Sequence, residues 1–226
     1  MIKLRGIYET GNRINDEPLV YVFEDFMSDQ EADALLEAAR SRLKQAQVSA
    51  DTAGVESAGR TGSNCWVPHY YNPVVGGLAE RVAEVVGISL ENAESLQVVH
   101  YRETQEYAPH FDAWDATTER GKRCMARGGQ RMVTCLLYLN EVEGGGGTCF
   151  PGLDLEVRAC KRRMLLFHNC EPGTTLRHSH SLHGGLPVSR GEKWACNFWF
   201  RERSYQTNTI GNTPRTKQQP RFNRVV

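Results

Sequence analysis

The stretch Tyr107-Ala108-Pro109-His110-Phe111-Asp112 places a histidine and an aspartate two positions apart at the end of a predicted strand. Side chains two positions apart on a strand leave the same face, so His110 and Asp112 can both reach one ion. Far downstream, His183 offers a second imidazole. Two imidazole nitrogens and one carboxylate oxygen on one side of an octahedron leave three coordination positions open, a donor set that suits ferrous ion. The sequence therefore predicts a metal site.

A His-x-Asp motif by itself is weak support for such a site. The chain contains seven histidines and eight aspartates in 226 residues, so random placement gives roughly a one-in-four expectation of finding one such pair. Two further histidines, His178 and His180, lie close to His183. The remaining sequence has to decide whether the motif carries chemistry and which histidine completes it.

The composition indicates one globular domain without a strongly charged partner. Lysine and arginine number 27, as do aspartate and glutamate, so we expect neither nucleic acid nor an acidic membrane surface as a partner. No stretch approaches the ~20 apolar residues of a membrane span, and no secretory signal is recognisable. The seven cysteines include no CxxC pair, which argues against a zinc site or a disulfide framework and favours free thiols in a reducing cytoplasm.

The N-terminal part of the chain has the pattern of one strand and two helices. Leu19–Phe26 alternates loosely between apolar and polar residues, as a strand does. Ser28-Asp29-Gln30-Glu31 is a capping box, and apolar residues follow it at helical spacing. Residues 46–64 have no periodicity and predict a loop that is long enough to act as a mobile binding element. Asn72 followed by Pro73 predicts the start of the second helix.

From Glu94 onward the apolar pattern has a period of two, which indicates strands. The predicted strands are Leu96–Tyr101, Tyr107–Asp112, Met132–Leu139, Thr148–Phe150, Met164–His168 and Trp194–Phe200. Gly144–Gly147 predicts a turn with positive φ, whereas residues 113–131 are polar and basic and predict an exposed loop. Many short strands closed by Gly and Pro turns predict a mainly β chain with flanking helices, a jelly-roll barrel with N-terminal helices packed on it.

These patterns predict a single domain over residues 1–205. Within it, residues 1–93 form the expected helical support and residues 94–205, approximately, the jelly-roll core. After Tyr205 the chain becomes polar, so residues 206–226 are predicted to be a loose C-terminal tail.

Two residues lie at informative distances from the predicted metal ligands. Lys193 follows His183 by ten positions, and Tyr101 precedes His110 by nine. An iron with three open positions can hold a 2-oxo acid through its carboxylate and keto oxygens and keep one position for dioxygen. A second carboxylate on that acid needs a buried cation and hydrogen-bond donors. Lys193 can supply the charge, and Tyr101 or Thr134 the donors.

Several motifs occur in one order between Arg60 and Arg201. They are Arg60-Thr61-Gly62-Ser63, Leu96-Gln97-Val98-Val99-His100-Tyr101, Tyr107–Asp112, Arg131-Met132-Val133-Thr134-Cys135-Leu136-Leu137-Tyr138-Leu139, Gly146-Gly147-Thr148-Cys149-Phe150-Pro151 and the block from His183 to Trp199. Together they resemble the 2-oxoglutarate- and Fe(II)-dependent prolyl 4-hydroxylases, of the compact type related to the catalytic domain of the collagen enzymes. All of the motifs in order make a specific signal, although each one alone is moderate.

The resemblance implies a set of metal ligands. His110, Asp112 and His183 would hold Fe(II). His183 is preferred over His178 and His180 because it alone has the downstream proline and lysine at the distances found in the family. The other two histidines are expected to lie in a loop or next to the ligands.

The resemblance also implies a co-substrate pocket. Lys193 would pair with the distal carboxylate of 2-oxoglutarate, Tyr101 and Thr134 would line the same pocket, and Trp199 would lie near the metal and the substrate. The implied fold is a double-stranded β-helix, which is a jelly roll. The implied reaction consumes O2, and L-ascorbate is expected to restore iron that is oxidised in unproductive turnover.

The chain departs from the family pattern in three places. Cys160-Lys161-Arg162-Arg163 replaces a usual lysine-glycine turn, and His168 replaces a common aromatic residue. Arg201 stands where many relatives have a different polar residue close to the substrate. These departures leave the iron chemistry intact but bear on the identity of the substrate. His69 and His100 are isolated in the sequence and are expected to be structural.

The resulting prediction is an enzyme that hydroxylates proline in a peptide or protein. Residues 46–64 and 113–131 are the predicted loops that close over the substrate. The arginines of the second loop are expected to be solvated, with steering of an acidic substrate as the alternative. Two other functions stay open: a 2-oxoglutarate dioxygenase for a free amino acid or another side chain, and a jelly roll that binds metal or peptide without catalysis. Either a monomer or a homodimer is compatible with the sequence.

Overall fold

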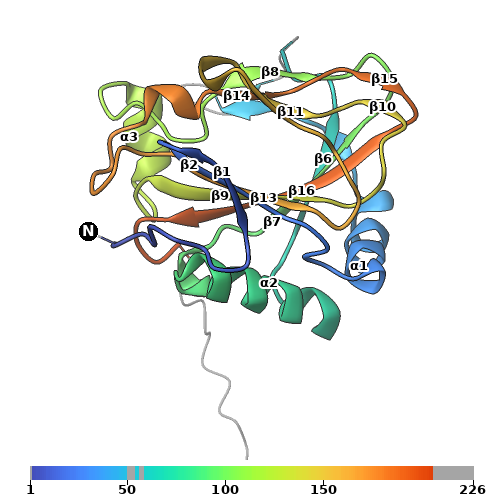
Figure 1. The fold of residues 1–226 in the computed structure, drawn as a ribbon, viewed down its shortest axis with the longest axis horizontal. Helices are drawn as coiled ribbons and strands as arrows, with labels where there is room; N and C mark the ends of the chain where they lie inside the picture. The colour runs from blue at the N-terminus through green and yellow to red at the C-terminus, as the bar shows by residue number, and fades with distance from the viewer. Residues whose placement is uncertain (1, 50–53, 56–58, 206–226) are drawn as a thin grey trace, which may run out of the picture.

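The computed structural model describes residues 2–49, 54–55 and 59–205 (Figure 1). The predicted tail 206–226 lies outside the described residues, as does part of the predicted loop 46–64. The elements are, in chain order, β1 (Asn12–Asp16), β2 (Leu19–Phe23), α1 (Asp29–Arg40), β3 (Lys44–Gln45), β4 (Val48–Ser49), β5 (Gly54–Val55), β6 (Ser63–Val67), α2 (Pro73–Val86), the 3-10 turn η1 (Leu90–Asn92), β7 (Leu96–Tyr101), β8 (Tyr107–His110), α3 (Glu119–Met125), β9 (Arg131–Tyr138), β10 (Gly144–Gly145), β11 (Thr148–Phe150), η2 (Pro151–Leu153), β12 (Leu155–Val157), β13 (Met164–His168), η3 (Ser179–Ser181), β14 (His183–Gly185), β15 (Val188–Arg190) and β16 (Lys193–Arg201).

The strands form a large and a small sheet. The large sheet has eight strands in the order β1-β2-β13-β9-β16-β7-β6-β3, and the small sheet has four in the order β12-β11-β14-β8. The strand pairs within both sheets are antiparallel. In Figure 1, β8, β14 and β11 lie on one side of the large sheet, and α1 and α2 lie on the other. This mainly β arrangement is consistent with the predicted jelly roll.

The central strands of the large sheet are buried on both faces because they are apolar at both alternating positions. Along β9, Cys135 and Leu137 belong to the apolar cluster that includes the helices. Leu136 and Tyr138 belong to a second cluster, which includes Phe150 of the small sheet. A strand that is buried on both faces has a continuous apolar sequence rather than an alternating one. The predicted strand Met132–Leu139 is therefore confirmed as the buried strand β9, and the predicted strand Met164–His168 is confirmed as β13.

The helices α1 and α2 begin where the sequence predicts. Ser28 Oγ accepts a hydrogen bond from the Glu31 N–H at 3.2 Å, and Glu31 Oε2 accepts one from the Ser28 N–H at 2.8 Å, which completes the capping box. Asn72 Oδ1 accepts from the Val75 N–H at 2.9 Å. Gly87 ends α2 with a φ of 75°, a conformation that favours glycine. None of the helices in the described part of the chain is long and apolar enough to cross a membrane.

Strands from the N-terminal part complete the large sheet. β2 pairs with β13, and β6 pairs with β7. Residues 1–93, predicted as a helical support, therefore also supply strands. Of the strands that join the large sheet, β1, β3 and β6 are missing from the sequence prediction, because each has five residues or fewer and mostly polar or mixed side chains. Such short segments become strands through their partners rather than through their own pattern.

Residues 113–131 do not form the exposed loop that the sequence predicts. The segment contains α3, whose N-terminal cap is Thr118. The buried Gln130 side chain accepts from the Trp114 N–H and donates to the Trp114 carbonyl, both at 2.9 Å. α3 has only seven residues and is mostly polar, so it lacks the apolar stripe by which longer helices are recognised. Tertiary contacts decide its structure.

All seven cysteines are free, as predicted. Four of them are buried: Cys65, Cys135, Cys170 and Cys196. Burial raises the pKa of the Cys170 thiol to about 12 and that of Cys135 still further. Cys135 and Cys170 are therefore protonated at neutral pH and act as small apolar core residues.

Replacement of Ser28 by alanine tests the capping box. Loss of the hydroxyl acceptor is expected to lower the free energy of unfolding by about 1 kcal/mol, measured by urea denaturation followed by circular dichroism. Ser41→Ala at the other end of α1 is the control and should change stability by less than about 0.5 kcal/mol. Equal effects of the two substitutions would contradict the assigned role of Ser28.

Candidate metal centre and adjoining cavity

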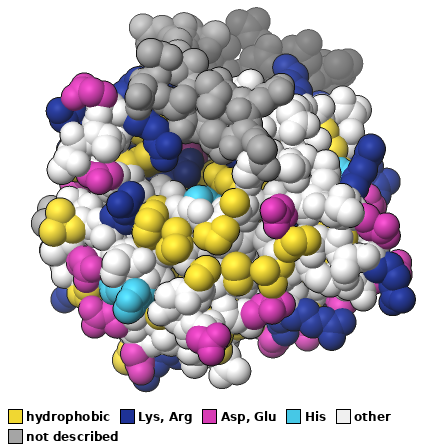
Figure 2. All heavy atoms as spheres, turned by 90° about the horizontal axis from the view of Figure 1, so that it is seen from above, with side chains coloured by type: hydrophobic (Ala, Val, Ile, Leu, Met, Phe, Trp, Pro, Cys, Tyr) yellow, Lys and Arg dark blue, Asp and Glu magenta, His cyan; other side chains and the backbone are white. Residues whose placement is uncertain are grey.

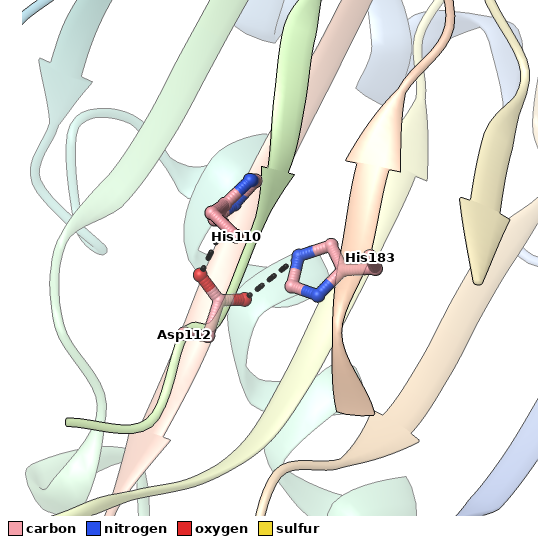
Figure 3. A group of neighbouring side chains, drawn as sticks. All are labelled: His110, Asp112 and His183. Atoms are coloured by element: carbon pink, nitrogen blue, oxygen red, sulfur yellow. Dashed lines mark ion pairs between the residues drawn. The ribbon is translucent and has the colours of Figure 1, made fainter. Parts of the chain in front are cut away.

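The candidate metal ligands meet where β8 and β14 pair in the small sheet. His110 and His183 are direct cross-strand partners in this pair, and Asp112 follows just after β8 ends. Asp112 Oδ1 lies 3.8 Å from His110 Nε2, and Asp112 Oδ2 lies 3.5 Å from His183 Nε2. Figure 3 shows the three side chains grouped around the carboxylate. One ligand atom from each residue lies within 4.8 Å of the other two.

Both imidazole rings are oriented by backbone carbonyls. His110 Nδ1–H donates to the Ala108 carbonyl at 3.0 Å, and His183 Nδ1–H donates to the Ser181 carbonyl at 2.9 Å. Because a carbonyl only accepts, these contacts assign the ring proton to Nδ1 and leave the Nε2 lone pair free. Burial, together with the nearby His183 ring, lowers the pKa of His110 to about 3. The His110 ring is therefore neutral, as a metal ligand must be.

Asp112 is a buried carboxylate that remains ionised. Burial favours its neutral form, but the two imidazoles and the Arg131 guanidinium outweigh that effect and lower the pKa of Asp112 to about 2. Thr134 Oγ1 donates to Asp112 Oδ2 at 2.7 Å, and Asn169 Nδ2 donates to Thr134 Oγ1 at 2.9 Å. The sequence predicts Thr134 as a donor to the co-substrate. In the structure, its hydroxyl proton is engaged by the carboxylate of the metal site.

The three side chains fit a ferrous ion. Two ligands at right angles around an ion, with bonds of about 2.1 Å, lie about 3 Å apart. The observed separations of 3.5 and 3.8 Å therefore require only small side-chain shifts. Two neutral imidazoles and one carboxylate form the donor set of non-haem Fe(II) oxygenases. All three residues line a cavity, so further ligands can approach the ion from that side.

This cavity has a volume of about 490 Å³ and is lined by residues of both sheets. It brings together all seven site residues predicted from the sequence: His110, Asp112, His183, Lys193, Tyr101, Thr134 and Trp199. Lys193 is the cross-strand partner of Tyr101 in the β16–β7 pair, and Trp199 is the partner of Thr134 in the β16–β9 pair. The register of the large sheet thus places both pairs in one wall.

Lys193 carries a buried ammonium group in the cavity wall. Its exposed fraction is 3%, and burial lowers its pKa to about 8. Within the described residues, the ammonium has no carboxylate or hydrogen-bond partner. The Tyr138 and Tyr101 ring centroids lie 5.5 and 5.9 Å from Nζ. A buried cation without a counter-charge is unfavourable, and this environment suits an anionic ligand.

Aromatic side chains form much of the remaining wall. The Tyr107 ring stacks on the His110 ring with centroids 3.6 Å apart. The buried Trp199 Nε1–H has no hydrogen-bond partner within the described residues. The Arg131 guanidinium lies 3.7 Å from the centroid of the Trp199 ring. Tyr101 is buried, which raises the pKa of its hydroxyl.

Comparisons with known proteins agree with this donor set. Residues 96–201 match the family model of the 2OG-Fe(II) oxygenase superfamily. The chain is 34% identical over 210 residues to prolyl 4-hydroxylase 5 of Arabidopsis thaliana, and the alignment covers 83% of this chain and 69% of that protein. The chain belongs to the prolyl 4-hydroxylase family.

Other prolyl 4-hydroxylases have a similar or lower sequence identity to this chain. The chain is 33% identical to Probable prolyl 4-hydroxylase 7 of Arabidopsis thaliana over 84% of its own length, and it spans 64% of that relative. The solved structure of the viral collagen prolyl hydroxylase from Paramecium Bursaria Chlorella virus-1, in complex with 2OG, has a TM-score of 0.63 and 26% sequence identity. That match covers 80% of this chain and 95% of the viral chain.

A buried ion network that the sequence does not predict lies behind the metal centre. Arg131 Nε and Nη2 donate to the two carboxylate oxygens of Glu94 at 2.6 and 2.8 Å. Arg201 Nη1 donates to the same carboxylate at 2.9 Å, and Arg131 Nη1 lies 3.7 Å from Asp112 Oδ1. The prediction that Arg131 is solvated is wrong, because this residue begins β9. Its position directly before an apolar run was the signal available in the sequence.

The Arg201 side chain is buried against the C-terminal end of α3. Its side chain is 2% exposed, and its guanidinium donates to the carbonyls of Cys124 and Arg127 at 2.7 and 2.5 Å. These carbonyls lie at the C-terminal end of α3, where a cation is favourable. Arg201 is not among the residues that line the cavity, and its side chain anchors α3.

The other five histidines make contacts outside the triad. They are His69, His100, His168, His178 and His180. His69 Nε2–H donates to the Glu94 carbonyl at 2.6 Å, and the His168 ring is hydrogen-bonded to the Tyr8 hydroxyl at 2.8 Å. His178 Nδ1 accepts from the His180 N–H at 3.1 Å, beside η3. The structural assignment of His69 and His100 is confirmed.

Replacement of Glu94 by glutamine tests the ion network. Two buried guanidinium groups would lose a shared carboxylate, so the free energy of unfolding is expected to fall by about 3–5 kcal/mol. Urea denaturation measures the change. Glu119→Gln, which removes the carboxylate of an exposed ion pair with Lys122, is the control and should change stability by less than about 1 kcal/mol.

Replacement of Thr134 by valine tests its contact with Asp112. The side chain keeps its shape but loses the hydroxyl that orients the carboxylate. Metal affinity is therefore expected to fall about 10- to 100-fold, measured by titration with Co(II) followed by visible absorption. Thr117→Val, at an exposed position, should leave the affinity unchanged. An unchanged affinity in Thr134→Val would mean that this hydroxyl does not position the ligand.

Proposed function

We propose that this chain is a prolyl 4-hydroxylase that modifies proline in a peptide or protein. The reaction would consume O2 and 2-oxoglutarate and release succinate and carbon dioxide. One observation carries the proposal: the two histidines and the aspartate of the triad line the same cavity as the buried ammonium of Lys193. A module that only binds metal has no need of that ammonium. The similarity to prolyl 4-hydroxylases supports the same function.

In this proposal His110, Asp112 and His183 hold the metal. When bound, Fe(II) supplies the activation of dioxygen, coupled to oxidative decarboxylation of 2-oxoglutarate. The protein turns the Nε2 atoms of both imidazoles toward the metal position, because their Nδ1–H groups donate to the Ala108 and Ser181 carbonyls. Such contacts fix the ring orientation and the tautomer before metal binds.

Lys193 and Tyr101 are proposed to hold the distal carboxylate of 2-oxoglutarate. The ammonium is desolvated before the ligand arrives, so its attraction for a carboxylate is stronger than it would be in water. The Tyr101 hydroxyl is a donor on the adjacent strand. Binding at both ends would leave the 2-oxo acid in one orientation at the metal, and this positioning is the contribution of the protein to the rate.

The substrate proline is proposed to enter beside Tyr107 and Trp199. Both rings line the cavity and would exclude water from one side of the proline ring. The Trp199 Nε1–H has no partner within the described residues and can donate to a peptide carbonyl or a ligand of the metal. Trp66 is 43% exposed and also lines the cavity, so it would contact the peptide outside the reacting centre.

We further infer the domain organisation, the need for ascorbate and the cellular compartment. Residues 1–205 act as one jelly-roll domain with the helices as its support. The segment 113–131 and the described residues Gln47, Gly59 and Arg60 border the substrate. Ascorbate restores iron after unproductive turnover. The free thiols favour a reducing compartment such as the cytoplasm.

Incubation with Fe(II), 2-oxoglutarate and a proline-rich peptide tests the proposal. The expected result is a peptide mass increase of one oxygen, with one succinate per modified proline. Succinate release without peptide modification would favour the alternative substrates, a free amino acid or another side chain. With iron verified as bound, the absence of both products would leave a non-catalytic binding module.

The pH dependence of co-substrate binding tests Lys193. Because burial lowers its pKa to about 8 in the free protein, and only the ammonium form attracts a carboxylate, affinity should be constant below about pH 8. Above that pH it should weaken about tenfold per pH unit. Calorimetric titration of 2-oxoglutarate into the Co(II)-loaded protein between pH 6.5 and 9 measures this.

Lys193→Arg is the matched variant, because a guanidinium stays protonated throughout this pH range. It should bind 2-oxoglutarate more weakly, since its geometry differs, but with no loss of affinity above pH 8. A flat pH profile in the unaltered protein would show that another group supplies the charge.

A further inference from the structure

The cavity in front of the metal ligands has an excess of positive charge. Asp112 is the one carboxylate among the described residues that line it. The cations that line it are Arg60, Arg120, Arg131, Arg177 and Lys193. On the face seen in Figure 2, Lys and Arg side chains lie around a hollow. A cavity with walls of one charge sign concentrates ligands of the opposite sign.

Three of these five cations have other partners or roles. Arg131 is paired with Glu94. The Arg60 guanidinium is buried and donates to a side-chain amide oxygen and a backbone carbonyl, both at 3.0 Å. Lys193 is assigned to the co-substrate. The other two cations, Arg120 and Arg177, are more exposed to solvent, and neither has a role in the proposed reaction.

Arg177 holds its guanidinium beside the metal centre. Its Cζ lies 4.1 Å from the centroid of the Phe111 ring, and Phe111 lies between the two metal ligands of the motif in the chain. Stacking fixes the guanidinium plane and leaves its N–H groups available at the edge. Arg177 Nη2 makes one long ion pair, 3.9 Å from Asp115 Oδ2, whereas Asp115 Oδ1 accepts from the hydroxyl and the N–H of Thr117 at 2.6 and 2.9 Å.

Arg120 lies on α3, and α3 is held firmly at the edge of the cavity. A Cβ at Gly121 would collide with the Asp115 carbonyl, so the helix approaches that segment as closely as glycine allows. Arg201 binds two carbonyls at the other end of α3. Within the described residues, the Arg120 side chain makes no ion pair or hydrogen bond, although it lines the cavity.

We propose that Arg120 and Arg177 select a substrate in which an acidic residue lies close to the target proline. This inference rests on the proposed function and names the substrate class. A side-chain carboxylate near the proline would meet two guanidinium groups that line the cavity, and charge-assisted hydrogen bonds are stronger than neutral ones. A lysine at the same position would be repelled by both groups.

Three peptides of equal length test the selection. Each contains one proline, flanked on both sides by Asp, Asn or Lys, and hydroxylation by the Fe(II)-loaded enzyme is followed by mass spectrometry. The Asp peptide is expected to have a kcat/KM about tenfold above that of the Asn peptide at low salt, with the Lys peptide slowest. The difference between Asp and Asn should shrink at 0.5 M NaCl, about the concentration that screens such contacts.

Variants of the two arginines locate the effect. Arg120→Gln and Arg177→Gln should each lower the Asp-to-Asn ratio of kcat/KM about threefold, and the double variant should bring the ratio close to one. Arg177→Glu should favour the Lys peptide over the Asp peptide. Lys122→Gln is the control: it lies on the same helix, makes the same change in net charge and should keep the wild-type ratio.

The outcomes separate this inference from the proposed function. Modification of all three peptides at equal rates, or an Asp preference that the double variant keeps, would overturn the inference alone. Modification of none of them would contradict the proposed function and the inference together. A phosphoserine peptide that is preferred more than tenfold over the Asp peptide would assign the two arginines to phosphate and overturn the carboxylate assignment.

Discussion

The pairing of β8 with β14 is the contact on which the rest of the site depends. It sets His110 directly opposite His183, so the two imidazoles share one face of the small sheet and Asp112 follows at the strand end. The two strands have only four and three residues, and β14 is also paired with β11. A slip of one residue in this register would turn one imidazole to the other face, and the three ligand atoms would no longer meet.

The ion pairs of the residues that line the cavity determine which charged groups are free to bind a ligand. The imidazoles and Arg131 keep Asp112 ionised despite its burial, and Glu94 holds Arg131 in place. Lys193 has no such partner within the described residues, so its ammonium is available to an anion. Paired charges at one end and a buried ammonium in the wall suit a ligand that chelates a metal and carries a second carboxylate. The large sheet, buried on both faces, keeps these side chains in place.

Helices and strands that are specified by neighbouring residues in the chain were predicted correctly from the sequence. The capping box at Ser28, the cap at Asn72 and the apolar run of β9 each depend on residues that are close in the chain. The prediction for residues 113–131 is wrong because contacts between positions far apart in the chain order this segment. Gln130 binds the carbonyls of Trp114 and Thr175, and Arg201 binds the carbonyl of Cys124. The same limit applies to the short strands β1 and β6, whose partners rather than their own patterns make them strands.

By itself, the sequence determined the chemistry of the site, because the types and spacing of the motif residues specify which donors and charges are present. The seven side chains that it predicted for the site all line one cavity. Only the tertiary structure decided that Thr134 donates to Asp112, that Glu94 joins Arg131 to Arg201, and that Arg120 and Arg177 remain at the rim. Each of these facts depends on contacts between segments far apart in the chain, and no local pattern of residues encodes such contacts.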